Sequence, residues 1–211
     1  MVDIAPSMLG ADFGRMREAA EMVGPHSAYL HMDVMDGHFV PNLTMGPDLV
    51  KSLAGIAPLD VHLMVTDPID FIEDFRDAGA EIITVHVEAN NPLKALESIK
   101  KNNMKAGIAL NPSTPENSIE PFIDLADLIL VMSVEPGYCG QDFHEDAVER
   151  VKHYKKAYPN KIIEVDGGVS PSNSGRLADA GADILVAGSA IFKAENPIET
   201  LKKMKGVKLI N

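Results

Sequence analysis

Short runs of apolar residues alternate along the chain with stretches in which apolar positions recur at helical spacing. The runs are nearly continuous in apolar side chains, which is typical of parallel strands that are covered on both faces. The stretches between them are amphipathic, as expected of helices that pack one face against a sheet. We therefore predict eight strands, over residues Asp3–Ser7, Tyr29–Asp33, Leu59–Leu63, Ile82–Val87, Lys105–Leu110, Leu128–Met132, Ile162–Asp166 and Ile184–Ala187.

The intervening stretches predict helices that connect successive strands. Gly79 and Gly181 follow two of these stretches and lead directly into a strand, as expected where a helix ends at a left-handed residue. The helices are expected over residues Gly14–Met22, Pro68–Ala78, Leu93–Asn102, Glu145–Ala157 and Ser172–Ala180.

The order of these elements predicts the fold class. The strand and helix patterns follow one another without a break in composition or a linker rich in proline, glycine or serine. Such a chain favours an α/β fold, a (β/α)8 TIM barrel in one domain over residues 1–211. A doubly wound parallel sheet is the alternative, but it seldom uses eight strands in a chain of 211 residues.

Composition and charge disfavour several classes of protein. The net charge of -12 argues against binding to nucleic acid or to an anionic membrane, because both require a basic face. The chain has one cysteine, and no apolar run is long enough to span a bilayer. Residues 1–5 also lack the basic-then-apolar pattern of a signal peptide. We expect a cytoplasmic protein with a small-molecule substrate, and the sequence leaves open whether it forms a homo-oligomer.

Four potential metal ligands lie at the ends of predicted strands. His31 and Asp33 occupy positions i and i+2 of one strand, so their side chains point to the same face. His62 and Asp166 lie near the ends of two other strands. Because the carboxyl ends of barrel strands meet at one face, we expect the four groups to converge. Two imidazoles and two carboxylates suit one divalent metal ion such as Zn, Fe, Mn or Co, and the carboxylates can also move protons.

Other residues at the strand ends allow two interpretations. Met35, Met64 and Met132 indicate either core packing or an apolar wall that keeps water out of a site. His86 and Glu88 have the same i, i+2 spacing, and we expect this pair to support a ligand or the local structure.

Two glycine-rich turns follow the seventh and eighth predicted strands. Gly167 with Gly168, and Gly188 with Ser189, allow backbone N–H groups to approach an anion, and barrels frequently bind phosphate at this position. No arginine accompanies these turns, so we expect backbone amides to hold the phosphate. A third glycine-rich segment, residues 134–141, is either a mobile lid or an ordinary surface connection.

These features occur in blocks that resemble the ribulose-phosphate 3-epimerase family over essentially the whole chain. The resemblance implies a (β/α)8 barrel that binds a divalent metal ion and interconverts D-ribulose 5-phosphate and D-xylulose 5-phosphate, an isomerase of carbohydrate metabolism. The matching blocks are Ile4–Ser7, His31–Asn42, Asp60–Val65, Leu110–Pro112, Val131–Val134, Pro136–Gly137, Glu164–Val169 and Ala187–Ala190.

The resemblance also implies roles for individual residues. The metal ligands fall on His31, Asp33, His62 and Asp166, and the acid/base pair falls on Asp33 and Asp166. The two aspartates would invert C3 of the sugar through an enediolate, whose charge a bound metal stabilises. Together with the strand-end methionines and the lid, the expected substrate contacts are Ser7, Met35, His62, Met64, Met132, Gly137, Tyr138, Cys139, Gly140, Gly167, Gly168, Gly188 and Ser189.

The chain also departs from the family pattern. The usual lid sequence Asn-Pro-Gly-Phe-Gly-Gly-Gln is changed at Glu135, Tyr138 and Cys139, and Gly10 stands where serine is common. Because blocks such as His31–Pro47 and Pro58–Pro68 also resemble allulose-6-phosphate 3-epimerase, that six-carbon activity is an alternative. A sugar-phosphate decarboxylase or aldol-type synthase would want a lysine among residues 33–36, which contain none. A non-catalytic phosphate-binding barrel is a further alternative that metal analysis would test.

Overall fold

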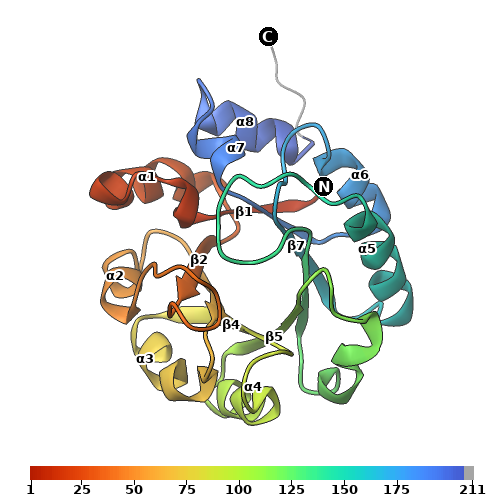
Figure 1. Ribbon diagram of the computed structural model, residues 1–211. Coiled ribbons are helices and arrows are strands. Elements are labelled where there is room, and N and C mark those ends of the chain that lie inside the picture. Colours follow the sequence, from red (N-terminus) through yellow and green to blue (C-terminus); the bar gives the residue numbers. More distant parts are fainter. Residues whose placement is uncertain (207–211) are drawn as a thin grey trace.

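The computed structural model describes residues 1–206 and contains a ring of eight parallel strands (Figure 1). Each strand from β2 to β8 pairs with its neighbour in the sequence, and β8 also pairs with β1. A bridge between Ser7 and His31 connects β1 to β2 and brings the ring close to closure. The predicted TIM barrel is confirmed. Its strands are β1 (Asp3–Pro6), β2 (Leu30–Met35), β3 (Leu59–Met64), β4 (Ala80–His86), β5 (Lys105–Leu110), β6 (Leu128–Met132), β7 (Ile162–Asp166) and β8 (Ile184–Ala187).

Helices surround the ring and connect successive strands (Figure 1). On β3, Val61 and Leu63 belong to the apolar core between strands and helices, and the alternation of a strand turns Asp60 and His62 the other way, into the ring. The helices are α1 (Met16–Val23), α2 (Pro47–Ser52), α3 (Ile72–Asp77), α4 (Pro92–Lys101), α5 (Asp146–Ala157), α6 (Ser174–Ala180), α7 (Ser189–Phe192) and α8 (Pro197–Met204), with 3-10 turns η1 (Met8–Gly10), η2 (Phe13–Arg15), η3 (Gly24–His26), η4 (Pro68–Phe71) and η5 (Glu116–Phe122).

Two of the three strands that carry the candidate ligands, β2 and β3, end later than the sequence predicts, whereas β7 has the predicted bounds. The sequence predicts a strand over Tyr29–Asp33, whereas β2 covers Leu30–Met35, because β2 and β3 stay paired to the last residue of both strands. Asp33 and His62 therefore lie two residues before the strand ends rather than next to a loop. Both side chains are buried in the structure.

The helical regions also differ in part from the predicted ones. The sequence predicts one helix over Pro68–Ala78, whereas the structure divides this stretch into η4 and α3. The short elements α2, η5, α7 and α8 are additional to the predicted helices. The predicted domain extends to residues 207–211, which lie outside the described residues. Within residues 1–206, no helix has the length and apolar character needed to cross a membrane.

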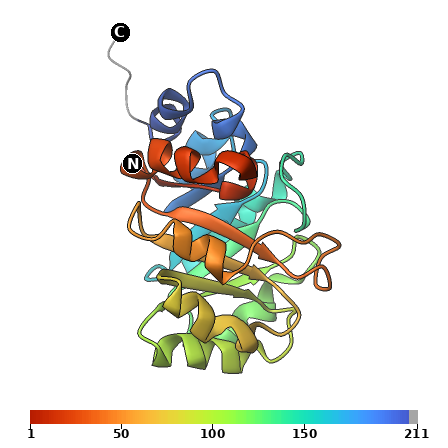
Figure 2. The ribbon, with the colours of Figure 1, turned by 90° about the vertical axis from the view of Figure 1, so that its left-hand side faces the viewer.

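The loops that follow β2 and β6 project from the same end of the barrel (Figure 2). This is the end at which the parallel strands finish, and it is where barrels build their active sites. The two loops are in contact, because the side-chain amide of Asn42 donates a hydrogen bond to the carbonyl oxygen of Gly137 at 2.8 Å.

Candidate active site

Two histidines and two aspartates meet inside the carboxyl end of the barrel. β2 supplies His31 and Asp33 on one face, and the parallel register places His62 of β3 beside Asp33. Asp166 is the last residue of β7. One ligand atom from each of the four residues lies within 4.8 Å of the others. The structure thus brings together all four residues that the sequence predicts as metal ligands.

The distances among these groups fit a shared cation. The Nδ1 atom of His62 lies 3.2 Å from Oδ1 of Asp33 and 4.0 Å from Oδ2 of Asp166. The Nε2 atom of His31 lies 3.5 Å from Oδ1 of Asp33 and is buried without a hydrogen-bond partner among the described residues. A buried polar atom without a partner is costly, and a divalent ion between these atoms would satisfy it. Two imidazole nitrogens and two carboxylate oxygens suit Zn, Fe, Mn or Co.

The two aspartates of this cluster have different electrostatic surroundings. Burial would raise the pKa of Asp33, but His31 and His62 outweigh burial and lower this pKa below its ordinary value. Burial, followed by the negative charge of Asp33, raises the pKa of Asp166 to about 7. Burial would lower the pKa of His31, but the carboxylates of Asp60 and Asp33 raise it well above the ordinary value. The cluster therefore holds protons as well as negative charge near neutral pH.

Hydrogen bonds orient two of the candidate ligands. The Nδ1 atom of His31 lies 2.6 Å from Oδ2 of Asp60, and a proton shared there leaves Nε2 free to bind a cation. Ser7 donates from its hydroxyl to Oδ2 of Asp33 at 2.6 Å. Ser7, which the resemblance assigns to the substrate, therefore also orients a candidate ligand.

Two buried carboxyl groups next to the ligands did not stand out in the sequence. Asp60 and Glu164 are completely buried, and with His31 they form a second cluster of potential ligands. Each lies two residues before a ligand on the same strand, so the i, i+2 rule that connects His31 to Asp33 is the signal that identifies them. Burial and the nearby charge of Asp60 raise the pKa of Glu164 well above its ordinary value.

His62 is supported from the side that faces away from Asp33. Its Nε2 atom lies 2.8 Å from Nε2 of His86, and Nδ1 of His86 lies 3.1 Å from Oε2 of Glu88. Burial lowers the pKa of His86 to about 4, so this imidazole is neutral at neutral pH. Of the two interpretations of His86 and Glu88, the contacts favour support of a ligand.

A cavity of about 150 Å³ opens beside the cluster, and Asp33 and Asp166 form part of its wall. His62 is completely buried and does not line it, unlike the other predicted substrate contacts. Among the described residues, those that line the cavity include no lysine or arginine. The predicted contacts in the cavity wall are Ser7, Met35, Met64, Met132, Gly137, Tyr138, Cys139, Gly140, Gly167, Gly168, Gly188 and Ser189.

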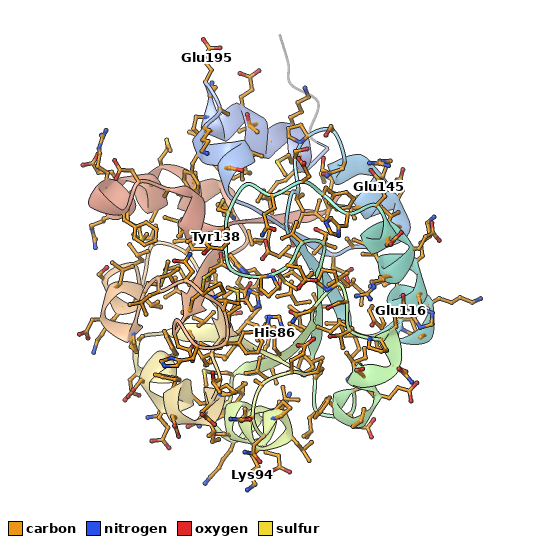
Figure 3. The ribbon with its side chains drawn as sticks, in the orientation of Figure 1. His86, Lys94, Glu116, Tyr138, Glu145 and Glu195 are labelled. Carbon is orange, nitrogen blue, oxygen red and sulfur yellow. The ribbon has the colours of Figure 1, made fainter. Side chains whose placement is uncertain are left out.

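The loop of residues 134–141 extends over the mouth of the barrel, and Tyr138 lies on it (Figure 3). The hydroxyl of Tyr138 donates to the carbonyl oxygen of Pro41 at 3.1 Å, and Asn42 holds Gly137 as described above. These two bonds attach the loop to the segment after β2. The loop therefore occupies the position of a lid over the cavity.

The turn after β7 requires glycine at two positions. Gly167 and Gly168 have φ angles of 109° and 59°, in the region that disfavours other residues. A Cβ atom on Gly167 would lie 2.6 Å from Cγ2 of Val134, and one on Gly168 would lie 2.7 Å from the backbone nitrogen of Phe143. This turn consequently presents bare backbone to the cavity.

A TIM barrel with imidazoles and carboxylates gathered at the carboxyl ends of its strands, beside a cavity, has the architecture of a barrel enzyme. Comparison with known proteins is more specific. The ribulose-phosphate 3-epimerase family, as described by its sequence model, matches residues 3–192. The chain belongs to this family, as the resemblance in the sequence predicts, and the protein is an isomerase.

The similar proteins cover nearly the whole chain. The cytoplasmic isoform of ribulose-phosphate 3-epimerase from Oryza sativa subsp. japonica is 45% identical over 210 residues, which cover 96% of this chain and 92% of that protein. Ribulose-phosphate 3-epimerase from Escherichia coli (strain K12) is 44% identical over 212 residues, with 96% and 94% covered. A crystal structure of 3-hexulose-6-phosphate synthase superimposes with a TM-score of 0.73 at 16% identity, covering 98% of this chain and 99% of that one, which shows a shared fold.

Proposed function

We propose that the protein interconverts D-ribulose 5-phosphate and D-xylulose 5-phosphate in a metal-dependent reaction. One observation carries the proposal: Asp33 and Asp166 line the same cavity from β2 and β7, two strands that β1 and β8 separate in the ring. Inversion at C3 needs one group to remove a proton from one face and another to return a proton to the opposite face. Two carboxyl groups on separate walls of one cavity suit these roles.

For this reaction, one of the two aspartates must be ionised and the other must carry a proton. In one direction the ionised aspartate removes the proton from C3, and the protonated one delivers its proton to the other face of the enediolate. In the reverse direction the roles exchange, as microscopic reversibility requires. When bound to His31, Asp33, His62 and Asp166, a divalent metal would supply Lewis-acid stabilisation of the negative charge that develops on the sugar oxygens.

The phosphate is expected at the turns after β7 and β8. Gly167, Gly168, Gly188 and Ser189 bring backbone to the cavity, and no cationic side chain within the described residues lines it. Backbone amides would then bind the phosphate. The five-carbon sugar is favoured over allulose 6-phosphate because the similar proteins over nearly the full chain are named ribulose-phosphate 3-epimerases. The cytoplasmic location remains a prediction, and the rice relative is named as a cytoplasmic isoform.

Replacing Asp166 by Asn tests the proton transfer. The substitution keeps the size of the side chain but removes the carboxyl group. Loss of general acid/base catalysis should lower kcat by roughly 10²–10⁴-fold, any disturbance of the metal would add to this, and the effect on KM should be smaller. Turnover in deuterated water should place solvent-derived deuterium at C3. Product without deuterium at C3 would exclude this mechanism.

Substrate choice and metal dependence need separate measurements. A coupled assay should give a higher kcat/KM for ribulose 5-phosphate than for allulose 6-phosphate, and the opposite order would transfer the proposal to the six-carbon sugar. Elemental analysis should find one divalent ion per chain, and chelation should abolish activity. A fully active protein without metal would refute the metal dependence.

A further inference from the structure

A chain of hydrogen bonds leads from His62 out of the ligand cluster to the loops after β4 and β5. The rings of His62 and His86 are stacked with centroids 5.0 Å apart and an angle of 20° between their planes, and their Nε2 atoms lie 2.8 Å apart. The opposite nitrogen of His86 contacts Oε2 of Glu88 at 3.1 Å. The second oxygen of Glu88 accepts from the hydroxyl of Thr114 and, at 2.9 Å, from the backbone N–H of Asn111.

The hydrogen bonds of this series all run in one direction from donor to acceptor, and Glu88 sets that direction. An ionised carboxylate has no proton to donate, so Nδ1 of His86 must carry the hydrogen in their shared bond. A neutral His86 then has a lone pair on Nε2 and accepts from Nε2–H of His62. His62 in turn keeps a lone pair on Nδ1, the nitrogen that faces Asp33 at 3.2 Å. The reverse direction would place a lone pair of His86 against the carboxylate.

The contacts that Glu88 makes keep it ionised. Burial would raise the pKa of Glu88, but hydrogen bonds from His86, Thr114 and the Asn111 amide outweigh burial and lower this pKa to about 2. His31 has a comparable arrangement with one fewer member, since Asp60 contacts its Nδ1 atom directly. Each histidine of the cluster is therefore connected to a carboxylate by hydrogen bonds. His31 contacts Asp60 directly, and His62 reaches Glu88 through the imidazole of His86.

We propose that His86 and Glu88 are positioning residues, which fix the tautomer and the ring orientation of His62 so that its Nδ1 lone pair is directed at a divalent cation. The proposal rests on the metal site of the proposed function and goes beyond its four ligands. Without a cation, the lone pair on Nδ1 of His62 faces a carboxylate oxygen of Asp33, and the buried Nε2 atom of His31 has no hydrogen-bond partner in the described residues. The network thus orients atoms of this cluster so that they can bind a cation.

The alternative is that His86 only fills space. Its side chain is completely buried and its ring lies 5.0 Å from that of Phe39 (Figure 3). Two substitutions separate these roles. His86→Leu retains apolar bulk but offers neither donor nor acceptor, whereas His86→Gln offers a carbonyl oxygen that can accept from His62 and an N–H that can donate to Glu88.

The experiment measures the affinity of the metal-free protein for Mn²⁺ by calorimetry. His86→Leu should weaken binding by about 10–100-fold, the usual effect of losing a partner of a metal ligand, and His86→Gln should restore most of the affinity. Glu88→Gln should weaken binding similarly, because its amide cannot accept from His86 and from Asn111 at the same time. Thr114→Val is the matched control, since it removes one donor to Glu88 but keeps the direction of the chain, and its affinity should stay within a few-fold of wild type.

Spectroscopy supplies a readout that simple packing would not change. In Co²⁺-loaded protein, His86→Leu and Glu88→Gln should alter the visible absorption bands, which report ligand geometry, while His86→Gln and Thr114→Val should leave them close to wild type. Equal affinity of wild type, His86→Leu and Glu88→Gln would overturn the proposal. So would a loss in His86→Gln as large as that in His86→Leu. Wild-type protein that binds no divalent cation would instead refute the proposed metal site and, with it, this role; if His86→Leu fails to fold, Glu88→Gln decides.

Discussion

Binding of a divalent cation should release a proton from Asp166, so affinity for the metal should depend on pH. Burial and the charge of Asp33 raise the pKa of Asp166 to about 7 in the metal-free protein. Below this pKa a metal ion must displace the proton before Asp166 can act as a ligand, and above it the carboxylate is already ionised. Affinity should therefore rise as pH increases through 7.

The size of the effect follows from the fraction of Asp166 that is ionised. With a pKa of about 7, this fraction is about 0.09 at pH 6 and about 0.91 at pH 8, a tenfold change that corresponds to about 1.4 kcal/mol of binding free energy. His31 acts in the same direction, because its pKa is also raised and its Nε2 proton must leave. The fall in affinity between pH 8 and pH 6 should thus be at least about tenfold.

Calorimetry with Mn²⁺ in buffers of different ionisation enthalpy would measure both the affinity and the number of protons released. At pH 6, wild-type protein should release about one proton or more per metal ion. Asp166→Asn binds more weakly but has no carboxyl proton to lose, so it should release about one proton fewer than wild type. An affinity that is the same at pH 6 and pH 8, with no proton release, would refute the reasoning.

Three further predictions concern packing and the lid. Gly107→Ala should lower the free energy of unfolding by about 1–3 kcal/mol in urea denaturation, because its Cβ would lie 2.1 Å from Oγ1 of buried Thr84, and adding Thr84→Ala should restore part of the loss. Cys139→Gly should change kcat and KM together in the epimerase assay, because the Cys139 side chain lies beside Gly188 and, unlike glycine, restricts the lid backbone; unchanged kinetics would contradict this. Asn42→Ala removes the bond to Gly137 and should raise KM several-fold with little effect on thermal stability, and a KM equal to wild type would show that this bond does not hold the lid.

The fold could be predicted because its signal is local and repeated. Continuous apolar runs such as Leu128–Met132 can be covered on both faces only in a layered α/β structure, and eight of them in 211 residues leave little choice but a barrel. Strand ends were less predictable. Whether β2 stops at Asp33 or continues to Met35 depends on the register with β3, which brings together residues far apart in the sequence.

The same division applies to the candidate site. His31 and Asp33 could be identified because residues i and i+2 of a strand point to the same face of the sheet. His62 and Asp166 could be identified because they lie near strand ends. The contact between His62 and His86 was less predictable, since it depends on how the side chains of adjacent strands stack inside the ring. Local spacing thus indicates which residues face inward, and only the closed ring determines which of them touch.

The balance of charge around the two ligand histidines supports the proposed cation. Four carboxyl groups, those of Asp33, Asp60, Glu164 and Asp166, surround His31 and His62, and the described residues that line the adjoining cavity include no lysine or arginine. Without a cation the protein limits this negative charge by holding protons, since the pKa values of Glu164, Asp166 and His31 are all raised. A divalent ion would neutralise the same charge without those protons. The release of protons on metal binding and the hydrogen-bond direction that Glu88 imposes on His62 therefore have the same origin. Both follow from a buried acidic cluster whose negative charge a bound cation would neutralise.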